Sequence, residues 1–342
     1  MVIRCAALAT GVAVLAGCGG SDDGGAGGAR AATTTTAARP ASPLSLTLDF
    51  TPNAVHSGLY VAQQRGAFAR AGVRVRIRVP GSGADGAKLL AAGRTDLAIM
   101  DIHDVALAQQ EGANLVAVAA VVQRPLAAVL ADGAVRRPRD LEGRRVGVTG
   151  LPSDDAALDQ IVRGDGGDPQ RVRRATIGFE AVASVVSGKV DASVGFWNAE
   201  GVALRARRPR TRIFRLDEFG APRYPELLVM ATRRTVETRG DAVARFAAAL
   251  GEGYRTVARS TPTDDAAIVR DLRAGSGDRT IDPETTTQQL DAVRPAFADA
   301  AGGAGTIDRA VMRTWSRWET QVGITKRAPD VDRLVWTRAP GR

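Results

Sequence analysis

Apolar and polar residues along this chain form short blocks that predict strands and helices in alternation. Compact apolar runs are typical of buried strands, and apolar residues at helical spacing are typical of helices that pack one face inward. The first half predicts strands at residues 44–50, 73–79, 97–100 and 115–122, and helices at residues 57–71, 87–92 and 105–111. The strand at 73–79 alternates Val or Ile with Arg, which indicates an edge strand, whereas 115–122 is apolar throughout and indicates a central strand.

A second set of elements begins after a predicted chain crossover near Arg124. Strands are predicted at residues 146–148, 174–177, 192–196 and 212–215, and helices at 154–164 and 180–187. Residues 224–232 are predicted to return to the first set as a strand, and helices follow at 236–256, 263–272, 283–298 and 308–322. Because strands and helices alternate, we expect parallel strands joined by crossover helices. The predicted fold class is α/β, with two lobes that each hold a mostly parallel sheet flanked by helices, and a helical C-terminal region.

The first forty residues differ in composition from the rest of the chain. An apolar run at residues 6–16 is too short to span a bilayer and stands where a secretory signal belongs. It ends in a Leu-Ala-Gly-Cys sequence that resembles a bacterial lipobox, in which cleavage precedes a lipid-carrying cysteine. We therefore predict a signal peptide at 1–17, lipidation at Cys18, a Gly-, Ala- and Thr-rich flexible tether at 18–42, lobe 1 at 43–124 and 225–342, and lobe 2 at 125–224.

The charge pattern and the cysteines bear on two further properties, nucleic-acid binding and disulfide bonding. The formal net charge is +9, but the basic residues are scattered, and four Trp, three Tyr and eight Phe offer few rings to stack on bases. We therefore expect no nucleic-acid partner. Cys5 leaves with the predicted signal peptide, so no disulfide is expected within the mature chain.

Polar and aromatic residues follow the predicted strands, at the positions where open α/β sheets hold their ligands. The candidate ligand-binding residues are Phe50, Asn53, His56, Asp101, Ser153, Trp197, Asn198, Glu200, Tyr224 and Glu226. Aromatic rings among them could enclose a flat heterocycle, and the amides and carboxylates could pair with ring nitrogens and an exocyclic amine.

Several of these residues also have a purely structural interpretation. Phe50 and Trp197 could pack in the core, and Tyr224 could pack at a hinge. Asn53 follows a proline and is a normal turn residue. Glu200 could be a first-turn helix residue that the helix dipole favours.

The two histidines could take part in a metal site. His56 and His103 fall in predicted cleft loops together with Asp101 and Asp104, a set of ligands that zinc accepts. The D-I-H-D sequence lacks the spacing of a known site, so we expect no metal and interpret Asp101 as a helix N-cap. Residues 81–86 (GSGADG) lack the phasing of a phosphate-binding loop, and no G-x-S-x-G, H-E-x-x-H or C-x-x-C motif occurs. We therefore expect no cofactor and no catalytic residue.

Six segments resemble the type II periplasmic-binding proteins of the nitrate, sulfonate and thiamine-precursor class. They are LDFTPNAVHSGLYVA (48–62), GAFARAGVRVRI (66–77), AAGRTDLAI (91–99), LEGRRVGV (141–148), VGFWNAEGVAL (194–204) and YPELLVMAT (224–232). Within that class the chain is most similar to the thiamine-pyrimidine branch, which includes solute receptors and a fungal pyrimidine synthase. Family members usually have Trp where this chain has Phe50.

The resemblance implies a lipid-anchored receptor of an ABC importer that captures hydroxymethylpyrimidine or formylaminopyrimidine between its lobes. It implies the use of the first-strand segment and of Glu200 in binding. The expected partners are a small heterocyclic solute, an ABC permease and the membrane, reached through Cys18. The expected state is an exported monomer, without enzymatic activity, at the outer face of the cell membrane or in the periplasm.

Two alternatives stay open at this point. The same receptor role could serve a flavin precursor or a sulfonate, although Arg124 and Arg223 are the only arginines expected near the cleft. A synthase of the fungal kind would need a Cys-rich motif and a lysine that binds pyridoxal phosphate. Only Lys88 lies near a predicted cleft loop.

Overall fold

The structure is a computed structural model that describes residues 42–82, 84–298 and 303–337. The predicted signal peptide, the lipidation site Cys18 and nearly all of the tether lie outside these residues. Within the described residues, no helix combines the length and the apolar character needed to cross a membrane. The first strand already starts at Ser42, the last residue of the predicted tether.

The first sheet has five strands. Their order is β2 (Val73–Arg78), β1 (Ser42–Thr47), β3 (Leu97–Asp101), β10 (Leu227–Thr232) and β4 (Leu115–Ala120). β1 pairs in parallel with both of its neighbours, and β10 runs antiparallel between β3 and β4. As predicted, β2 is an edge strand and the segment after residue 224 returns to this sheet.

The second sheet also has five strands, in the order β7 (Arg173–Thr176), β6 (Arg145–Val148), β8 (Ala192–Phe196), β5 (Ala127–Ala131) and β9 (Arg212–Arg215). β6 pairs in parallel with β7 and β8, and β5 runs antiparallel between β8 and β9. Four of the five strands in each sheet therefore point the same way, which confirms the predicted α/β class with mostly parallel sheets. The predicted residue limits of the two lobes stay a prediction.

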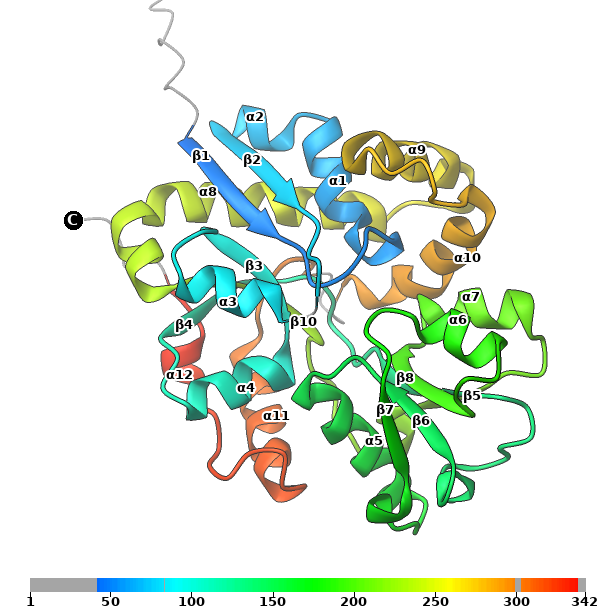
Figure 1. The fold of residues 1–342 in the computed structure, drawn as a ribbon. Coiled ribbons are helices and arrows are strands. Elements are labelled where there is room, and N and C mark those ends of the chain that lie inside the picture. Colours follow the sequence, from blue (N-terminus) through cyan, green and yellow to red (C-terminus); the bar gives the residue numbers. More distant parts are fainter. Residues whose placement is uncertain (1–41, 83, 299–302, 338–342) are drawn as a thin grey trace, which may run out of the picture. The chain divides into compact units, whose positions relative to one another are not determined.

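Helices flank both sheets (Figure 1). They are α1 (Ser57–Gln64), α2 (Ala67–Arg70), α3 (Asp85–Ala91), α4 (Ile102–Gln110), α5 (Pro152–Gly164), α6 (Ala181–Val186), α7 (Glu200–Arg207), α8 (Arg233–Ala258), α9 (Asp265–Ser276), α10 (Pro283–Val293), α11 (Arg309–Gln321) and α12 (Val331–Leu334). The predicted helix at 57–71 is two helices, because Gly66 between them adopts a φ of 75° that only glycine accepts readily.

The prediction of a central strand at 115–122 is wrong. β4 lies at the edge of the first sheet, because β10 inserts between it and β3. It is nevertheless apolar because the segment around Val335 covers its free side, where Ala117 forms a bridge with Val335. No strand was predicted at β5, whose apolar residues (AAVLA) lack an alternating pattern.

Alternate residues of β3 pack into different hydrophobic cores. In β3, Leu97 and Ile99 join the cluster under α1, α2 and α8, whereas Ala98 and Met100 join a second cluster on the other face. This second cluster extends into the other sheet and includes Val129 and residues of α5. Successive side chains of a strand point to opposite faces, so a sheet covered on both faces requires the continuous apolar runs seen here.

The close crossing of α1 and α8 gives a stability prediction. A Cβ atom on Gly253 would lie 2.8 Å from Ala62 Cβ and closer still to the carbonyl oxygen of Gly58. We therefore expect Gly253→Ala to lower the free energy of unfolding by about 1–3 kcal/mol or more, because the helices must separate. Denaturant unfolding followed by circular dichroism measures the change.

Gly240→Ala on the same helix is the matched control. Its Cβ would meet no atom closer than Trp336 Cζ2 at 3.5 Å, so the variant should be neutral or gain up to about 1 kcal/mol from helix propensity. Equal destabilisation in both variants would contradict the close-packing explanation.

Candidate functional site

A cavity of about 240 Å³ lies where loops after the strands of both sheets meet. Its lining comprises Asp49, Phe50, Asn53, Val55, Ala84, Ala87, Ile99, Met100, Asp101, Asp104, Leu107, Ala108, Glu111, Thr149, Leu151, Pro152, Ser153, Asp154, Phe179, Gly195, Phe196, Ala199, Glu200 and Leu227. Larger surface hollows of about 520 and 470 Å³ lie at α9–α10 and beside the end of α4, and neither draws on both sheets. The smaller cavity is therefore the candidate site, and its size suits a small molecule.

Phenylalanine rings form part of the cavity wall. Phe50 follows β1, and Phe179 follows β7 on the second sheet. Their ring centroids lie 4.3 Å apart at an interplanar angle of 63°. Phe196 adds a third ring at the end of β8. Such an arrangement offers aromatic faces and edges to a flat ligand.

Six carboxyl side chains also line the cavity, namely those of Asp49, Asp101, Asp104, Glu111, Asp154 and Glu200. No lysine or arginine occurs among the described lining residues. Most of these carboxylates are held by neutral donors. Asp104 accepts from the backbone N–H and hydroxyl of Ser153 at 3.1 and 3.0 Å, Asp154 accepts from the backbone N–H of Thr149, and Glu200 accepts from that of Phe196 at 3.1 Å.

Burial changes the acidity of these groups. Loss of solvent raises the pKa of Glu200 to about 7, with smaller contributions from the charges of Asp154 and Asp49. The same cause raises the pKa of Asp154 to about 6, and it raises the pKa of Asp104 and of Asp101 above the usual range. Glu200 can therefore act as a hydrogen-bond acceptor or, when protonated, as a donor near neutral pH.

Five of the ten predicted site residues line the cavity: Phe50, Asn53, Asp101, Ser153 and Glu200. The structural interpretation of Asn53 also holds, because its Oδ1 accepts from the backbone N–H of Val55 at 2.9 Å as a helix cap. Glu200 likewise begins α7 as well as facing the cavity. Asp101 caps α4 as predicted, accepting from the backbone N–H of His103 at 2.8 Å.

The structure does not bring the other five residues to the cavity wall. His56 is fully buried, and its Nε2 lies 2.9 Å from Oδ1 of Asp49, so it supports a lining carboxylate from behind. Trp197 donates from Nε1 to the carbonyl oxygen of Pro125 at 3.0 Å, and Arg215 stacks on its ring. Its neighbour in sequence, Phe196, faces the cavity instead.

Asn198, Tyr224 and Glu226 are also fully buried outside the lining. Asn198 has no hydrogen-bond partner for either polar side-chain atom within the described residues. Glu226 precedes β10, and its carboxylate accepts from the backbone N–H groups of Leu126 and Ala127, where the chain enters β5. Glu226 therefore ties together the two chain segments that connect the sheets.

Tyr224 and Glu226 belong to a buried polar cluster around His103. Nδ1 of His103 lies 2.9 Å from Glu319 on α11, and Nε2 lies 3.0 Å from the Tyr224 hydroxyl and 3.9 Å from Glu226. Burial opposes a charge on His103, but Glu319, Asp101 and Glu226 outweigh it and raise the pKa of His103 to about 10. The ring is therefore an imidazolium that neutralises the surrounding carboxylates.

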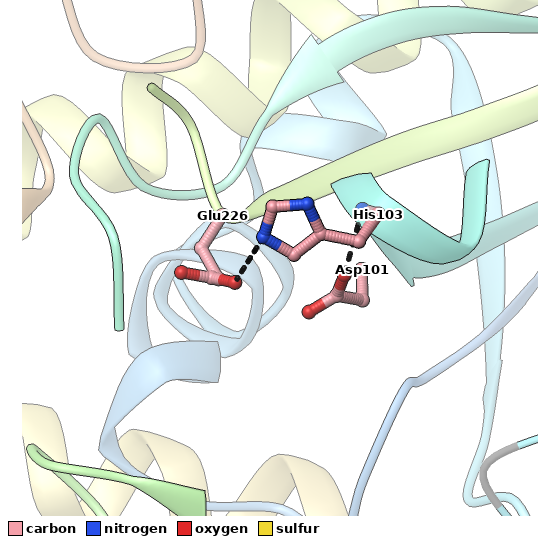
Figure 2. Close-up of side chains that lie close together, drawn as sticks. All are labelled: Asp101, His103 and Glu226. Atoms are coloured by element: carbon pink, nitrogen blue, oxygen red, sulfur yellow. Dashed lines mark hydrogen bonds and ion pairs between the residues drawn. The ribbon is translucent and has the colours of Figure 1, made fainter. Parts of the chain in front are cut away.

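Three members of this cluster have the composition of a metal site. Ligand atoms of Asp101, His103 and Glu226 lie within 4.8 Å of one another, and the side chains converge in Figure 2. Both ring nitrogens of His103 already have partners, so a cation would have to displace the Tyr224 hydroxyl and a proton. The geometry thus favours a buried ion-pair network over metal ligation. The set of possible zinc ligands considered from the sequence, His56 and His103 with Asp101 and Asp104, is not assembled among the described residues, since His56 pairs with Asp49 instead.

Two residues of the cavity lining, Asp49 and Phe179, were not predicted, although their positions after strands pointed to them. Asp49 stands inside the DFTPN segment, one position before Phe50. Phe179 follows a predicted strand, so the rule that places ligands at strand ends would have found it.

Comparison with known proteins agrees with this geometry. Residues 53–263, more than half of the chain, match the family model described as NMT1/THI5 like. The formylaminopyrimidine-binding protein of Halalkalibacterium halodurans is 38% identical over 214 residues, which cover 62% of this chain and 65% of the relative. The match thus spans just under two thirds of that relative's length.

Two further similarities are more distant. A 4-amino-5-hydroxymethyl-2-methylpyrimidine phosphate synthase of Uromyces fabae is 22% identical over 267 residues, covering 74% of this chain and 72% of the synthase. The solved structure of the alkanesulfonate-binding protein SsuA from Xanthomonas axonopodis pv. citri, bound to MOPS, superposes with a TM-score of 0.69 at 19% identity, covering 87% of this chain and 99% of that one. The latter likeness confirms the predicted binding-protein fold. The family match over more than half of its length shows that the chain belongs to the NMT1/THI5-like family.

Proposed function

We propose that this chain is the solute-binding receptor of an ABC importer and that its ligand is an aminopyrimidine precursor of thiamine, such as formylaminopyrimidine. The observation that carries the proposal is the cavity in which Phe50, Phe179 and Glu200 meet. The name of the relative at 38% identity points to the same ligand class.

The cavity chemistry suits an aminopyrimidine. The flat ring fits among the phenylalanines, and its amine can donate to Glu200 while a ring nitrogen pairs with the same carboxyl group. The Asn53 side chain is less available than expected, because Oδ1 and Nδ2 already bind the backbone of Val55 and Thr51. Glu200 is therefore assigned the main polar contact.

A sulfonate ligand fits this cavity poorly. Anion receptors place cationic or N–H donors against the charge, whereas carboxylates predominate here. Arg124 and Arg223 are exposed and do not line the cavity, and Arg223 donates to the carbonyl oxygens of Gln123 and Ala298. The similarity to the alkanesulfonate-binding protein therefore supports a shared fold and not a shared ligand.

A synthase activity is also less well supported than binding. Pyridoxal phosphate enzymes hold their cofactor through a lysine. Lys88 lies on α3 with an exposed side chain, and no lysine lines the cavity among the described residues. We infer a binding protein without enzymatic activity.

The receptor role brings further inferences about the whole protein. We infer export, anchoring through Cys18, a monomeric state and an ABC permease as partner. Ligand capture would close lobe 2, residues 125–224, on lobe 1, burying the aromatic rings and completing hydrogen bonds from both sides.

Isothermal titration tests the ligand assignment. The compounds are formylaminopyrimidine, 4-amino-5-hydroxymethyl-2-methylpyrimidine, riboflavin and an alkanesulfonate, each added to the purified chain from residue 39 onward, the compact unit that contains both sheets. We expect at least one of the two pyrimidines to bind with a Kd on the order of micromolar or tighter, and the other two compounds to bind far more weakly. Binding of the alkanesulfonate without binding of either pyrimidine would reverse the assignment.

A further inference from the structure

The carboxylates in the cavity lack counter-ions of the ordinary kind. Among the ion pairs of the described residues, none joins Asp104, Asp154 or Glu200 to a lysine or arginine. The charges that act most strongly on Glu200 are those of Asp154 and Asp49, which have the same sign as its own. Buried carboxylates without a cation are costly, so an arriving positive charge would be strongly favoured.

Two imidazoles lie near the cavity, and both already have partners. His56 is paired with Asp49, and His103 is bound by Glu319 and by the Tyr224 hydroxyl. Both imidazoles lie behind the lining rather than in it. Among the described residues, neither imidazole pairs with Asp154 or Glu200, which accept from the backbone N–H groups of Thr149 and Phe196.

The aromatic lining of the cavity also favours a positively charged ligand. The faces of Phe50, Phe179 and Phe196 carry negative quadrupole charge, which attracts cations within about 6 Å of the ring centre. Aromatic side chains are common surroundings of bound organic cations.

We infer that the cavity takes its ligand as an organic cation, with a proton on the pyrimidine ring, and that it rejects anionic derivatives of the same ring. The inference rests on the proposed function, because it specifies the charge state of that ligand. A ring N–H⁺ beside the exocyclic amine presents two parallel donors, which match the two oxygens of the Glu200 carboxylate. A phosphate ester of the hydroxymethyl group would instead bring at least one negative charge among six carboxyl groups.

Nitrogen NMR of the bound ligand tests the protonation state directly. The probe is 4-amino-5-hydroxymethyl-2-methylpyrimidine labelled with ¹⁵N in the ring, at pH 7.5 with protein in excess. We expect one ring nitrogen to show the upfield shift of a protonated nitrogen in the complex and not in free solution. Titration of the phosphate ester should give an affinity at least about 100-fold weaker, as expected for an unpaired like charge.

Two matched variants test whether Glu200 is the group that binds the protonated ring. Glu200→Gln should weaken binding of the probe about 10- to 100-fold and abolish the protonation shift, because the charged acceptor is gone. Glu237→Gln removes an equal charge from an exposed position on α8 and should change the affinity by less than about 2-fold.

The outcomes separate this inference from the proposed function. Tight binding of an unprotonated ring, or binding of the phosphate ester within about tenfold of the alcohol, overturns the cation inference and leaves the receptor assignment intact. Failure of every pyrimidine to bind overturns both.

Discussion

Glu319→Ala is expected to lower the free energy of unfolding by about 3–5 kcal/mol, the largest stability effect that we predict. Glu319 and His103 are at most 1% exposed and lie 2.9 Å apart. Removing the carboxylate leaves an imidazole among Asp101 and Glu226 without the partner that orients it. Because α11 is then no longer tied to α4, thermal and denaturant unfolding should both register the loss.

The pH dependence of this variant gives a second check. The folded protein holds the His103 proton to about pH 10, whereas the unfolded chain releases it near the ordinary pKa of 6.5. This contribution to stability is therefore complete below pH 6.5 and disappears as the pH rises toward 10. Glu319→Ala should flatten that decline.

The control for Glu319→Ala is a surface pair. Asp332 lies 2.7 Å from Arg309, but its side chain is 72% exposed, so Asp332→Ala should cost no more than about 1 kcal/mol. Equal losses in the two variants would show that the buried cluster is not held by charge.

Phe179→Ala is expected to weaken binding of formylaminopyrimidine by about 5- to 150-fold. Stacking of a heterocyclic base on one aromatic ring contributes about 1–3 kcal/mol by alanine substitution. Phe179 packs against Phe50 at 4.3 Å, so its loss also frees the second ring to move. Isothermal titration gives the ratio of dissociation constants, and circular dichroism verifies that the variant is folded.

Trp197→Phe tests the structure against the sequence-based assignment. The sequence predicted that Trp197 contacts the ligand, but its indole binds Pro125 and Arg215 outside the cavity. We expect this variant to change the affinity by less than about 3-fold. A larger loss from Trp197→Phe than from Phe179→Ala would restore Trp197 to the binding site.

The sequence predicted the fold well because its signals are local. The Val/Arg alternation of β2 and the apolar runs of β3 and β10 follow directly from how many faces of each strand are covered. The position of β4 could not be predicted in the same way. Its apolar pattern reports burial, and burial at the sheet edge depends on residues near Val335, more than two hundred positions away.

The site was predicted only in part, for a different physical reason. A residue's position after a strand identifies the loops that border the cavity. Whether its side chain points into the cavity depends on where the strand ends. Phe196 ends β8 and faces the cavity, whereas Trp197 lies in the turn that follows and donates to the carbonyl oxygen of Pro125 instead.

The role of a polar residue is also ambiguous in the sequence, because both binding sites and buried networks use polar side chains. Glu226 and Tyr224 are residue types that often bind ligands, but here they contact the buried His103. The other partner of His103 is Glu319, which lies on a helix far away in the sequence. Such long-range pairs carry no local pattern.

The most direct test is the crystal structure of the chain grown with formylaminopyrimidine. A ring packed against the Phe50–Phe179 pair, with its amine on Glu200, is the expected result. Electron density for the ligand at any other place, such as the hollow between α9 and α10, would contradict the account even if binding in solution were tight.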